Sequence, residues 1–205
     1  DRDEERTGPL ARELGNGAFP LVCDLSKAGD ITAAAETVEA EGGADILVNN
    51  AGILRPGALE SVAEADWSAM LSVNLTGYLA TSQAFGKGMI ARGDGALVHV
   101  ASIAGTQPQP ASGAYSASKA AILMLSRQLA YEWGPKGIRS NTVSPGLVRT
   151  PLSEPFYRDE AVKAKREAMV PLRRIATPQD MADVALFLAS HRASYVSGQD
   201  IVVDG

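Results

Sequence analysis

Short apolar runs bounded by turn residues alternate along this chain with longer segments of helical character, and this alternation constrains the fold more than any other feature. The apolar runs, which are typical of β-strands, lie at 18–23, 45–50, 96–102, 138–144 and 200–205. The segments of helical character lie at 30–42, 62–91, 113–135, 157–169 and 178–190. The last of these begins with Thr177 as a predicted N-cap and with Pro178 at the first helical position.

Strands that alternate with helices predict βαβ units, and therefore an α/β fold with a doubly wound parallel sheet flanked by helices on both faces. With 205 residues, 45% of them hydrophobic, residues 1–205 are expected to bury one core as a single domain. Ligands of such sheets bind at the carboxyl ends of the strands. The segment 150–177, which contains several prolines, is the longest connection without a sheet role, and such connections are often lids.

The composition makes several classes of partner improbable. Lys plus Arg (19) falls short of Asp plus Glu (24), so there is no net positive charge to attract nucleic acid or an anionic membrane. Cys23 is the only cysteine, which excludes an internal disulfide and suits a reducing cytoplasm, where we expect the protein to lie. His99 and His191 have no neighbours at metal-ligand spacing, so they are interpreted as structural or surface residues and no metal site is expected.

Tyr115 and Lys119 are the first candidates for chemistry. At positions i and i+4 their side chains lie side by side on one helical face, and a nearby ammonium favours the phenolate, which lowers the pKa of a tyrosine. A solvated helix face could also place such a pair by chance. Ser102 changes this balance, because it ends the apolar run 96–102, where this architecture binds its ligands.

Three further stretches are expected at the same edge of the sheet. NNAG (49–52) follows the run DILV, SPG (144–146) ends the run that begins at Ile138, and CDL (23–25) ends the first run. The small residues Ala51 and Gly52 would let a flat ligand approach the backbone closely. The need to form turns would not by itself explain why these three stretches occur together at strand ends.

The motifs NNAG, SVNLTG, YSASK, IRSNTVSPG and YVSGQDIVVDG, together with Ser102, match in order and spacing those of short-chain dehydrogenases/reductases of the classical type. The chain resembles this family along essentially its whole length. The resemblance implies a Rossmann-like fold and an NAD(P)-dependent oxidoreductase that exchanges hydride between the nicotinamide cofactor and a secondary alcohol or ketone. It also implies a homotetramer in which the helices near 62–91 and 113–135 form one interface.

The resemblance assigns catalytic roles to four residues. Tyr115 would be the general acid/base, and Lys119 would lower its pKa and bind the nicotinamide ribose. Ser102 would hold the substrate oxygen, and Asn74 would anchor a water that links Lys119 to solvent. The residues that would contact the cofactor are Asp1, Asp24, Leu25, Asn50, Ala51, Gly52, Tyr115, Lys119, Pro145, Gly146, Val148 and Thr150. Asp24 could instead cap a loop, and Thr150 could also be a helix N-cap before Pro151.

The family's glycine-rich loop, which cradles the pyrophosphate, has no counterpart in these residues. The opening DRDEERTGPLARELG resembles the end of the family's second strand and the helix after it, so we expect a longer protein whose first strand and glycine loop precede Asp1. Asp1 would then pair with the adenosine ribose and favour NAD, whereas the adjacent Arg2 could receive the phosphate of NADP.

The sequence leaves several substrate classes possible. The segment 150–177 corresponds to the family's substrate-covering region, where Leu152, Phe156, Tyr157 and Met169 could line an apolar pocket or pack the lid onto the body. Basic residues near it could attract an anion or form a solvated helix face. Candidate substrates are a 3-oxoacyl group on a carrier protein or CoA, a sugar or polyol, a steroid, and a small secondary alcohol. The rival class is a nonenzymatic dinucleotide-sensing or scaffold protein.

Overall fold

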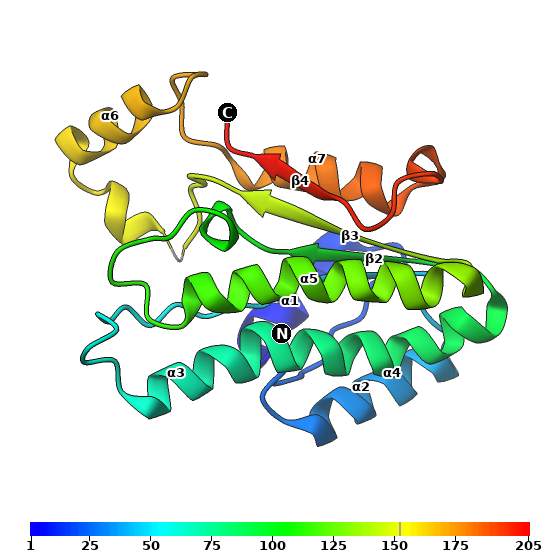
Figure 1. Ribbon diagram of the computed structural model, residues 1–205. Helices are drawn as coiled ribbons and strands as arrows, with labels where there is room; N and C mark the ends of the chain where they lie inside the picture. Colours follow the sequence, from blue (N-terminus) through cyan, green and yellow to red (C-terminus); the bar gives the residue numbers. More distant parts are fainter. Residues whose placement is uncertain (152) are drawn as a thin grey trace.

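Four parallel strands form the centre of the computed structural model, which describes residues 1–151 and 153–205 (Figure 1). The strands are β1 (Ile46–Asn49), β2 (Gly95–Val100), β3 (Ile138–Pro145) and β4 (Asp200–Val203). They lie side by side in chain order, and every neighbouring pair is parallel. All four carboxyl ends therefore reach the same edge of the sheet, as the alternation of strands and helices predicts.

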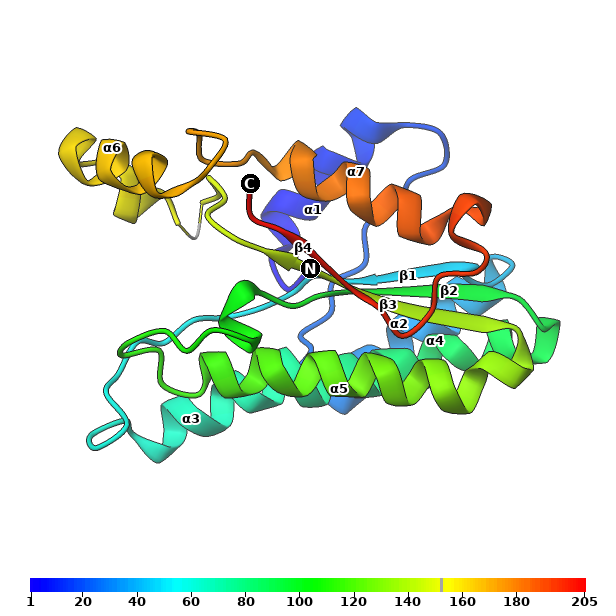
Figure 2. The ribbon, with the colours of Figure 1, turned by 45° about the horizontal axis from the view of Figure 1, so that its top comes forward.

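Helices cover both faces of this sheet. The helices α4 (Gly77–Arg92) and α5 (Tyr115–Trp133) pack on one face, with α2 (Ala28–Ala40) against α4. The helix α7 (Pro178–Ala189) packs on the other face, and α1 (Glu4–Leu14) lies on that side too (Figure 2). The predicted doubly wound α/β fold is confirmed. Within the described residues, none of the helices is long and apolar enough to cross a membrane.

The sequence of β2 is apolar almost throughout because helices cover both faces of this strand. Successive side chains of a strand point to opposite faces, so a strand covered on both sides needs apolar residues at consecutive positions. Leu97 packs with Met89 of α4 and Leu129 of α5, whereas Val98 packs with Leu188 of α7. The two sides of the core are thus joined through one strand.

The predicted strand at 18–23 is wrong, because this segment forms no strand and belongs to no sheet. Its backbone makes hydrogen bonds to Asp1: the Cys23 N–H donates to the Asp1 carbonyl at 3.0 Å, and the Asp1 nitrogen donates to Leu21 O at 3.3 Å. A strand requires a row of such pairs with a neighbour. Val22 and Phe19 accordingly remain about half exposed, at 49% and 48%.

The predicted helix at 62–91 is interrupted. It consists of α3 (Glu64–Leu71), a π-helical turn (Ser72–Thr76) and α4, which continue one another. A π turn inserts an extra residue into a helix and is frequent at functional sites. Here it contains Asn74, whose side chain is fully buried.

The segment 150–177 projects from the carboxyl edge of the sheet (Figure 1). Its helix α6 (Glu160–Met169) begins later than predicted, because the Asp159 carboxylate caps it by accepting from the N–H groups of residues 161 and 162. Tyr157 is buried at 3% exposure and Met169 is 72% exposed, so these two do not share an apolar pocket. Leu152 and the side chain of Phe156 lie outside the described residues.

The start of α7 agrees with its predicted N-terminus. The Asp180 carboxylate accepts hydrogen bonds from the N–H and the hydroxyl of Thr177, at 2.7 and 2.8 Å, with Pro178 at the first helical position. This is the reciprocal capping arrangement expected where Thr is followed three residues later by an acidic residue. It orients α7 across the sheet face opposite α5.

Candidate active site

Ser102 and Tyr115 come together where β2 ends and α5 begins. The backbone of Ser102 is extended, and its Oγ accepts a hydrogen bond from Ala104 N at 3.1 Å at the start of a short 3-10 turn. That turn lies directly against α5, since a side chain on Gly105 would come within 3.0 Å of the backbone of Lys119. Close packing of this turn on the helix brings the Ser102 hydroxyl within hydrogen-bonding reach of the Tyr115 phenol.

Burial raises the pKa of the Tyr115 phenol, and the hydrogen bond from Ser102 lowers it again in part. The net direction is opposite to the one expected from the lysine alone. A buried phenolate loses the solvation by water that stabilises its charge, and here that loss outweighs the nearby donors. Ser102 therefore acts on the ionisation of Tyr115, a role that the spacing of the sequence did not reveal.

Lys119 lies one turn further along α5, with only 3% of its surface exposed. Its Nζ donates to the Val100 carbonyl at 2.8 Å and lies 5.6 Å from the centre of the Tyr115 ring. Burial lowers the pKa of Lys119 to about 8. An ammonium has three N–H donors, so the bond to Val100 leaves it capacity for two further acceptors.

Asn74 links the π turn to the loop after β1. Its Oδ1 accepts from Ile53 N at 2.8 Å, and its Nδ2 donates to Ile53 O at 2.9 Å and to Ser118 Oγ at 3.2 Å. Both ends of the amide thus bind the protein itself and hold that loop against α5. The expected water-anchoring role of Asn74 stays a prediction.

The loop 50–52 is exposed and reaches the same place. A side chain on Gly52 would lie 3.5 Å from Asn74 Oδ1 and 3.7 Å from Lys119 Nζ. The absence of a side chain at this position keeps the approach to both groups open. The NNAG stretch and the YSASK stretch therefore meet, as their placement at strand ends predicts.

Asp24 forms a tight loop at one side of this cluster. Its carboxylate accepts from the N–H and the hydroxyl of Ser26, at 3.0 and 2.7 Å, and these bonds lower its pKa. This is the loop-capping alternative, and it does not prevent contact with a cofactor. Leu25 follows and packs so closely on α4 that a side chain on Gly77 would come within 2.9 Å of its Cβ.

The stretch 145–150 lies at the other side of the cluster, after β3. Gly146 N donates to Val203 O at 3.0 Å, and Val148 pairs with Ala176 in an isolated bridge. Thr150 is not the predicted helix N-cap. Its Oγ1 accepts from Ser153 N at 3.3 Å in a turn, and the short 3-10 helix that follows starts only at Glu154.

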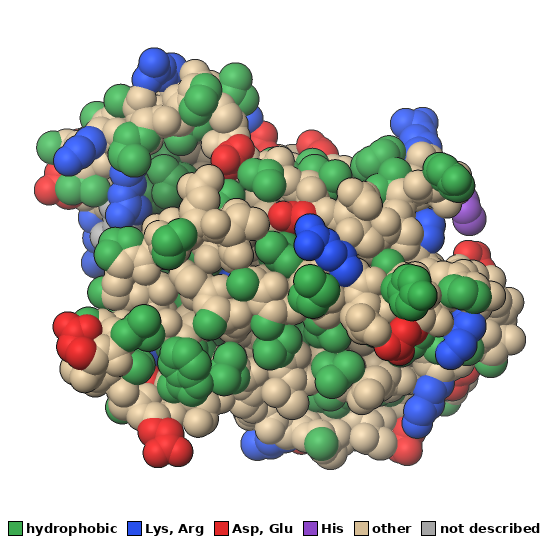
Figure 3. Space-filling model, in the orientation of Figure 1, with side chains coloured by type: hydrophobic (Ala, Val, Ile, Leu, Met, Phe, Trp, Pro, Cys, Tyr) green, Lys and Arg blue, Asp and Glu red, His purple; other side chains and the backbone are tan. Residues whose placement is uncertain are grey.

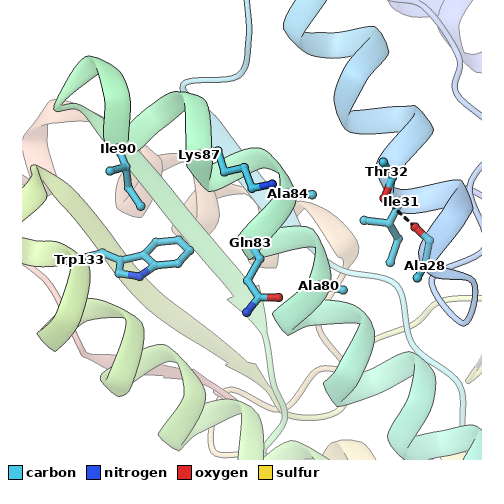
Figure 4. A pocket seen from close by; sticks show the side chains of 9 residues that line it. All are labelled: Ala28, Ile31, Thr32, Ala80, Gln83, Ala84, Lys87, Ile90 and Trp133. Atoms are coloured by element: carbon cyan, nitrogen blue, oxygen red, sulfur yellow. Dashed lines mark hydrogen bonds between the residues drawn. The ribbon is translucent and has the colours of Figure 1, made fainter.

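The structure therefore gathers Asn74, Ser102, Tyr115 and Lys119 at the carboxyl edge, with Asp24 and the 145–150 stretch on either side. A hollow of about 460 Å³ lies elsewhere, between α2, α4 and the end of α5 (Figure 4). Alanine, isoleucine and Trp133 line much of it, with Lys87 as its charged residue. It contains none of the four clustered residues, and we assign it no part in the chemistry.

A pair of buried aromatic residues lies near the cluster, and of these Tyr78 escaped the reasoning from sequence, whereas His99 was expected to be structural or exposed. Tyr78 and His99 are both fully buried, and their rings stack with centres 6.0 Å apart. Tyr78 Oη donates to Val100 O at 3.3 Å. The only signal in the sequence was a tyrosine four residues after Asn74, at the helical spacing that puts two side chains on one face.

A parallel sheet that carries a Ser–Tyr–Lys cluster, with the lysine buried, at the carboxyl ends of its strands defines the class of protein, a dinucleotide-binding α/β oxidoreductase. Comparison with known proteins identifies the family. A family model described as enoyl-(acyl carrier protein) reductase matches residues 1–205. D-threitol dehydrogenase of Mycolicibacterium smegmatis is 40% identical over 212 residues, which cover 100% of this chain and 80% of that protein.

Two further matches agree with this assignment. Galactitol 2-dehydrogenase (L-tagatose-forming) of Cereibacter sphaeroides is 40% identical and covers 100% of this chain and 82% of its own length. The structure of a gluconate 5-dehydrogenase from Burkholderia cenocepacia J2315 in complex with NADP and tartrate superposes with a TM-score of 0.93 at 34% identity, covering 100% of this chain and 82% of that one. The chain belongs to the short-chain dehydrogenase/reductase family. It is an oxidoreductase of alcohol groups that uses a nicotinamide dinucleotide.

Proposed function

We propose that Tyr115 is the general acid/base of this oxidoreductase and that Ser102, Lys119 and Asn74 assist it. The observation that carries the proposal is the buried Lys119 Nζ, which lies 5.6 Å from the centre of the Tyr115 ring and donates to the Val100 carbonyl at the end of β2, two residues before Ser102. During oxidation Tyr115 Oη takes the proton of the alcohol, and during reduction it returns a proton to the ketone oxygen. The Ser102 hydroxyl holds that oxygen and stabilises charge on it.

A nicotinamide dinucleotide would supply the hydride acceptor or donor, and the residues of the site fit such a group. Gly52 keeps the approach to Asn74 and Lys119 open, and Lys119 Nζ has donors for ribose hydroxyls. The remaining contacts that we propose come from both sides of the cluster: Asp24, Leu25, Asn50, Ala51, Pro145, Gly146, Val148 and Thr150.

Asp1 is proposed to select NAD over NADP. The hydrogen bond from Cys23 to its carbonyl places Asp1 beside the loop that holds Asp24. A carboxylate accepts from a ribose 2′-hydroxyl and repels a 2′-phosphate. Arg2 is its rival, since its charge helps to lower the pKa of Asp24 and could attract the phosphate. Fluorescence titration with NADH and NADPH in parallel tests this: tighter NADH binding is expected, and a preference for NADPH would reverse the assignment.

A sugar alcohol or a related polyhydroxy compound is the substrate class that we propose. The support is the 40% identity to the threitol and galactitol dehydrogenases. Residues 150–177 are proposed to cover the substrate. A rate screen with polyols, steroids and 3-oxoacyl thioesters should favour polyols. Clear preference for a thioester would point to the family's acyl reductases instead.

The general acid/base role is tested by Tyr115→Phe, which removes the transferable proton with little loss of volume. We expect turnover to fall by about 10²–10⁴-fold while the fold and dinucleotide binding persist. Tyr195→Phe is the matched control, since Tyr195 is fully exposed, lies outside the cluster and should leave the rate unchanged. Turnover of Tyr115→Phe at the wild-type rate would reject the mechanism.

A homotetramer, assembled in part through the outer face of α4 and α5, is proposed as the working form, and the cytoplasm as its location. This face exposes Leu79 at 37%, Met124 at 59% and Tyr131 at 83%. Figure 3 shows hydrophobic side chains over α4 and α5, with many of the charged ones near the rim of this view. Such a patch is often an interaction surface.

A further inference from the structure

The ammonium of Lys119 lies between two phenol rings rather than beside one. The centre of the Tyr78 ring on α4 is 5.6 Å from Nζ, the same distance as the centre of the Tyr115 ring on α5. Both distances are within the range at which a cation is attracted to the face of an aromatic ring. The family motif accounts for Tyr115 but not for Tyr78.

Tyr78 is tied to Lys119 a second time, through the backbone. The Val100 carbonyl accepts from Lys119 Nζ at 2.8 Å and from Tyr78 Oη at 3.3 Å, so the two side chains share one acceptor. Stacking on His99 behind it and complete burial hold the Tyr78 ring in place. Burial, and the neighbouring Tyr115, raise the pKa of the Tyr78 phenol, so it remains a neutral donor and does not compete as a base.

The need for such a partner follows from the burial of the charge. Burial alone brings the pKa of Lys119 down to about 8, close to the pH at which the ammonium must be present to stabilise the Tyr115 phenolate. The titratable groups that face Lys119 are Tyr115 and Tyr78, with His99 behind the latter. Any loss of attraction from Tyr78 would therefore lower the charged fraction of Lys119 near neutral pH.

We infer that Tyr78 is a positioning residue that holds the Lys119 ammonium at the active site and keeps it charged through its ring. The inference rests on the proposed function, in which the charge of Lys119 assists proton transfer at Tyr115. The ring makes the larger contribution, because Lys119 still donates to Val100 when the Tyr78 hydroxyl is absent.

Three variants separate the ring from the hydroxyl and from simple packing. Tyr78→Leu removes both groups, Tyr78→Phe removes only the hydroxyl, and Phe85→Leu removes a ring elsewhere on α4. In Tyr78→Leu the rising limb of the pH profile of kcat/KM for alcohol oxidation should move to higher pH by about one unit. At a fixed pH on that limb, this shift corresponds to an approximately tenfold fall in kcat/KM. In Tyr78→Phe and Phe85→Leu the limb should stay within about 0.3 units of the wild type. Tyr78→Met replaces Tyr78→Leu if the latter does not fold.

A direct titration of Lys119 provides the readout that does not depend on turnover. In protein labelled with ¹³C-lysine, the Lys119 signal, assigned by its loss in Lys119→Met, should titrate at lower pH in Tyr78→Leu than in the wild type and Tyr78→Phe. An unchanged midpoint in Tyr78→Leu, or an equal change in Phe85→Leu, would overturn the inference. A different result, full activity of Tyr115→Phe, would overturn the proposed function.

Discussion

At the scale of the residue, His99 is the centre of a buried polar network that joins the strands beneath the active site. Asn49 Oδ1 accepts from Thr81, which directs the Asn49 amide nitrogen at His99 Nδ1, 3.1 Å away. Nδ1 is therefore the acceptor, and the ring proton is assigned to Nε2, which lies 3.2 Å from Ser140 Oγ. This network requires the neutral ring, and burial lowers the pKa of His99 to about 4.

The free energy of unfolding should therefore fall as the pH drops from 6.5 toward 4. In this window the unfolded chain binds a proton at His99 that the folded protein does not, so acid favours unfolding. His99 alone should remove about 2 kcal/mol between pH 7 and pH 5. Urea denaturation at the two pH values measures this loss.

His99→Asn should reduce this pH dependence even if it lowers stability overall, because it removes the titrating group. His191→Asn is the matched control for replacing a histidine, as His191 is exposed. An equal loss between pH 7 and pH 5 in wild type and His99→Asn would contradict the assignment.

At the scale of the element, α4 and α5 pack closely against each other because position 86 of α4 has no side chain. A Cβ on Gly86 of α4 would come within 2.5 Å of the Trp133 ring at the end of α5. Gly86→Ala should destabilise the protein by about 1–2 kcal/mol, because overpacking outweighs the better helix propensity of alanine. The shift in the midpoint of thermal or urea unfolding measures this change.

Gly29→Ala is the matched control for this prediction. Gly29 also lies in a helix, α2, but nothing is within 4 Å of the position of its added Cβ. The substitution should be neutral or stabilising by up to about 1 kcal/mol. If both alanine variants changed stability alike, packing of Trp133 on α4 would not be the reason for glycine at position 86.

At the scale of the whole molecule, the apolar outer face of α4 and α5 should carry the proposed assembly. Met124→Glu puts a charge on this face, and burying an uncompensated charge in an interface is strongly unfavourable. The variant should shift the protein to smaller species at a given concentration in sedimentation or light scattering. Leu14→Glu is the control, since Leu14 on α1 is 62% exposed and lies away from this face. Identical mass distributions for Met124→Glu and wild type would place the interface elsewhere.

The four catalytic candidates could be named from the sequence because their signals are local. Tyr115 and Lys119 are one helical turn apart and Ser102 ends an apolar run, so periodicity singled out these three residues. Asn74 and the catalytic roles came only from the resemblance of short motifs to those of a known family. The same local signals located four of the five predicted strands. They failed at 18–23, since an apolar segment becomes a strand only when a neighbouring strand pairs with it.

What the sequence alone determined was the order of strands and helices and the kinds of side chain at the strand ends, because hydrophobic period and turn propensity depend on nearby residues. Only the tertiary structure decided the direction of the pKa shift of Tyr115, the π turn at Asn74, and the contact of Tyr78 with Lys119. Burial and contact depend on which distant segments lie together. A tyrosine 41 positions before Lys119 therefore carries no sign in the sequence that its ring faces that ammonium.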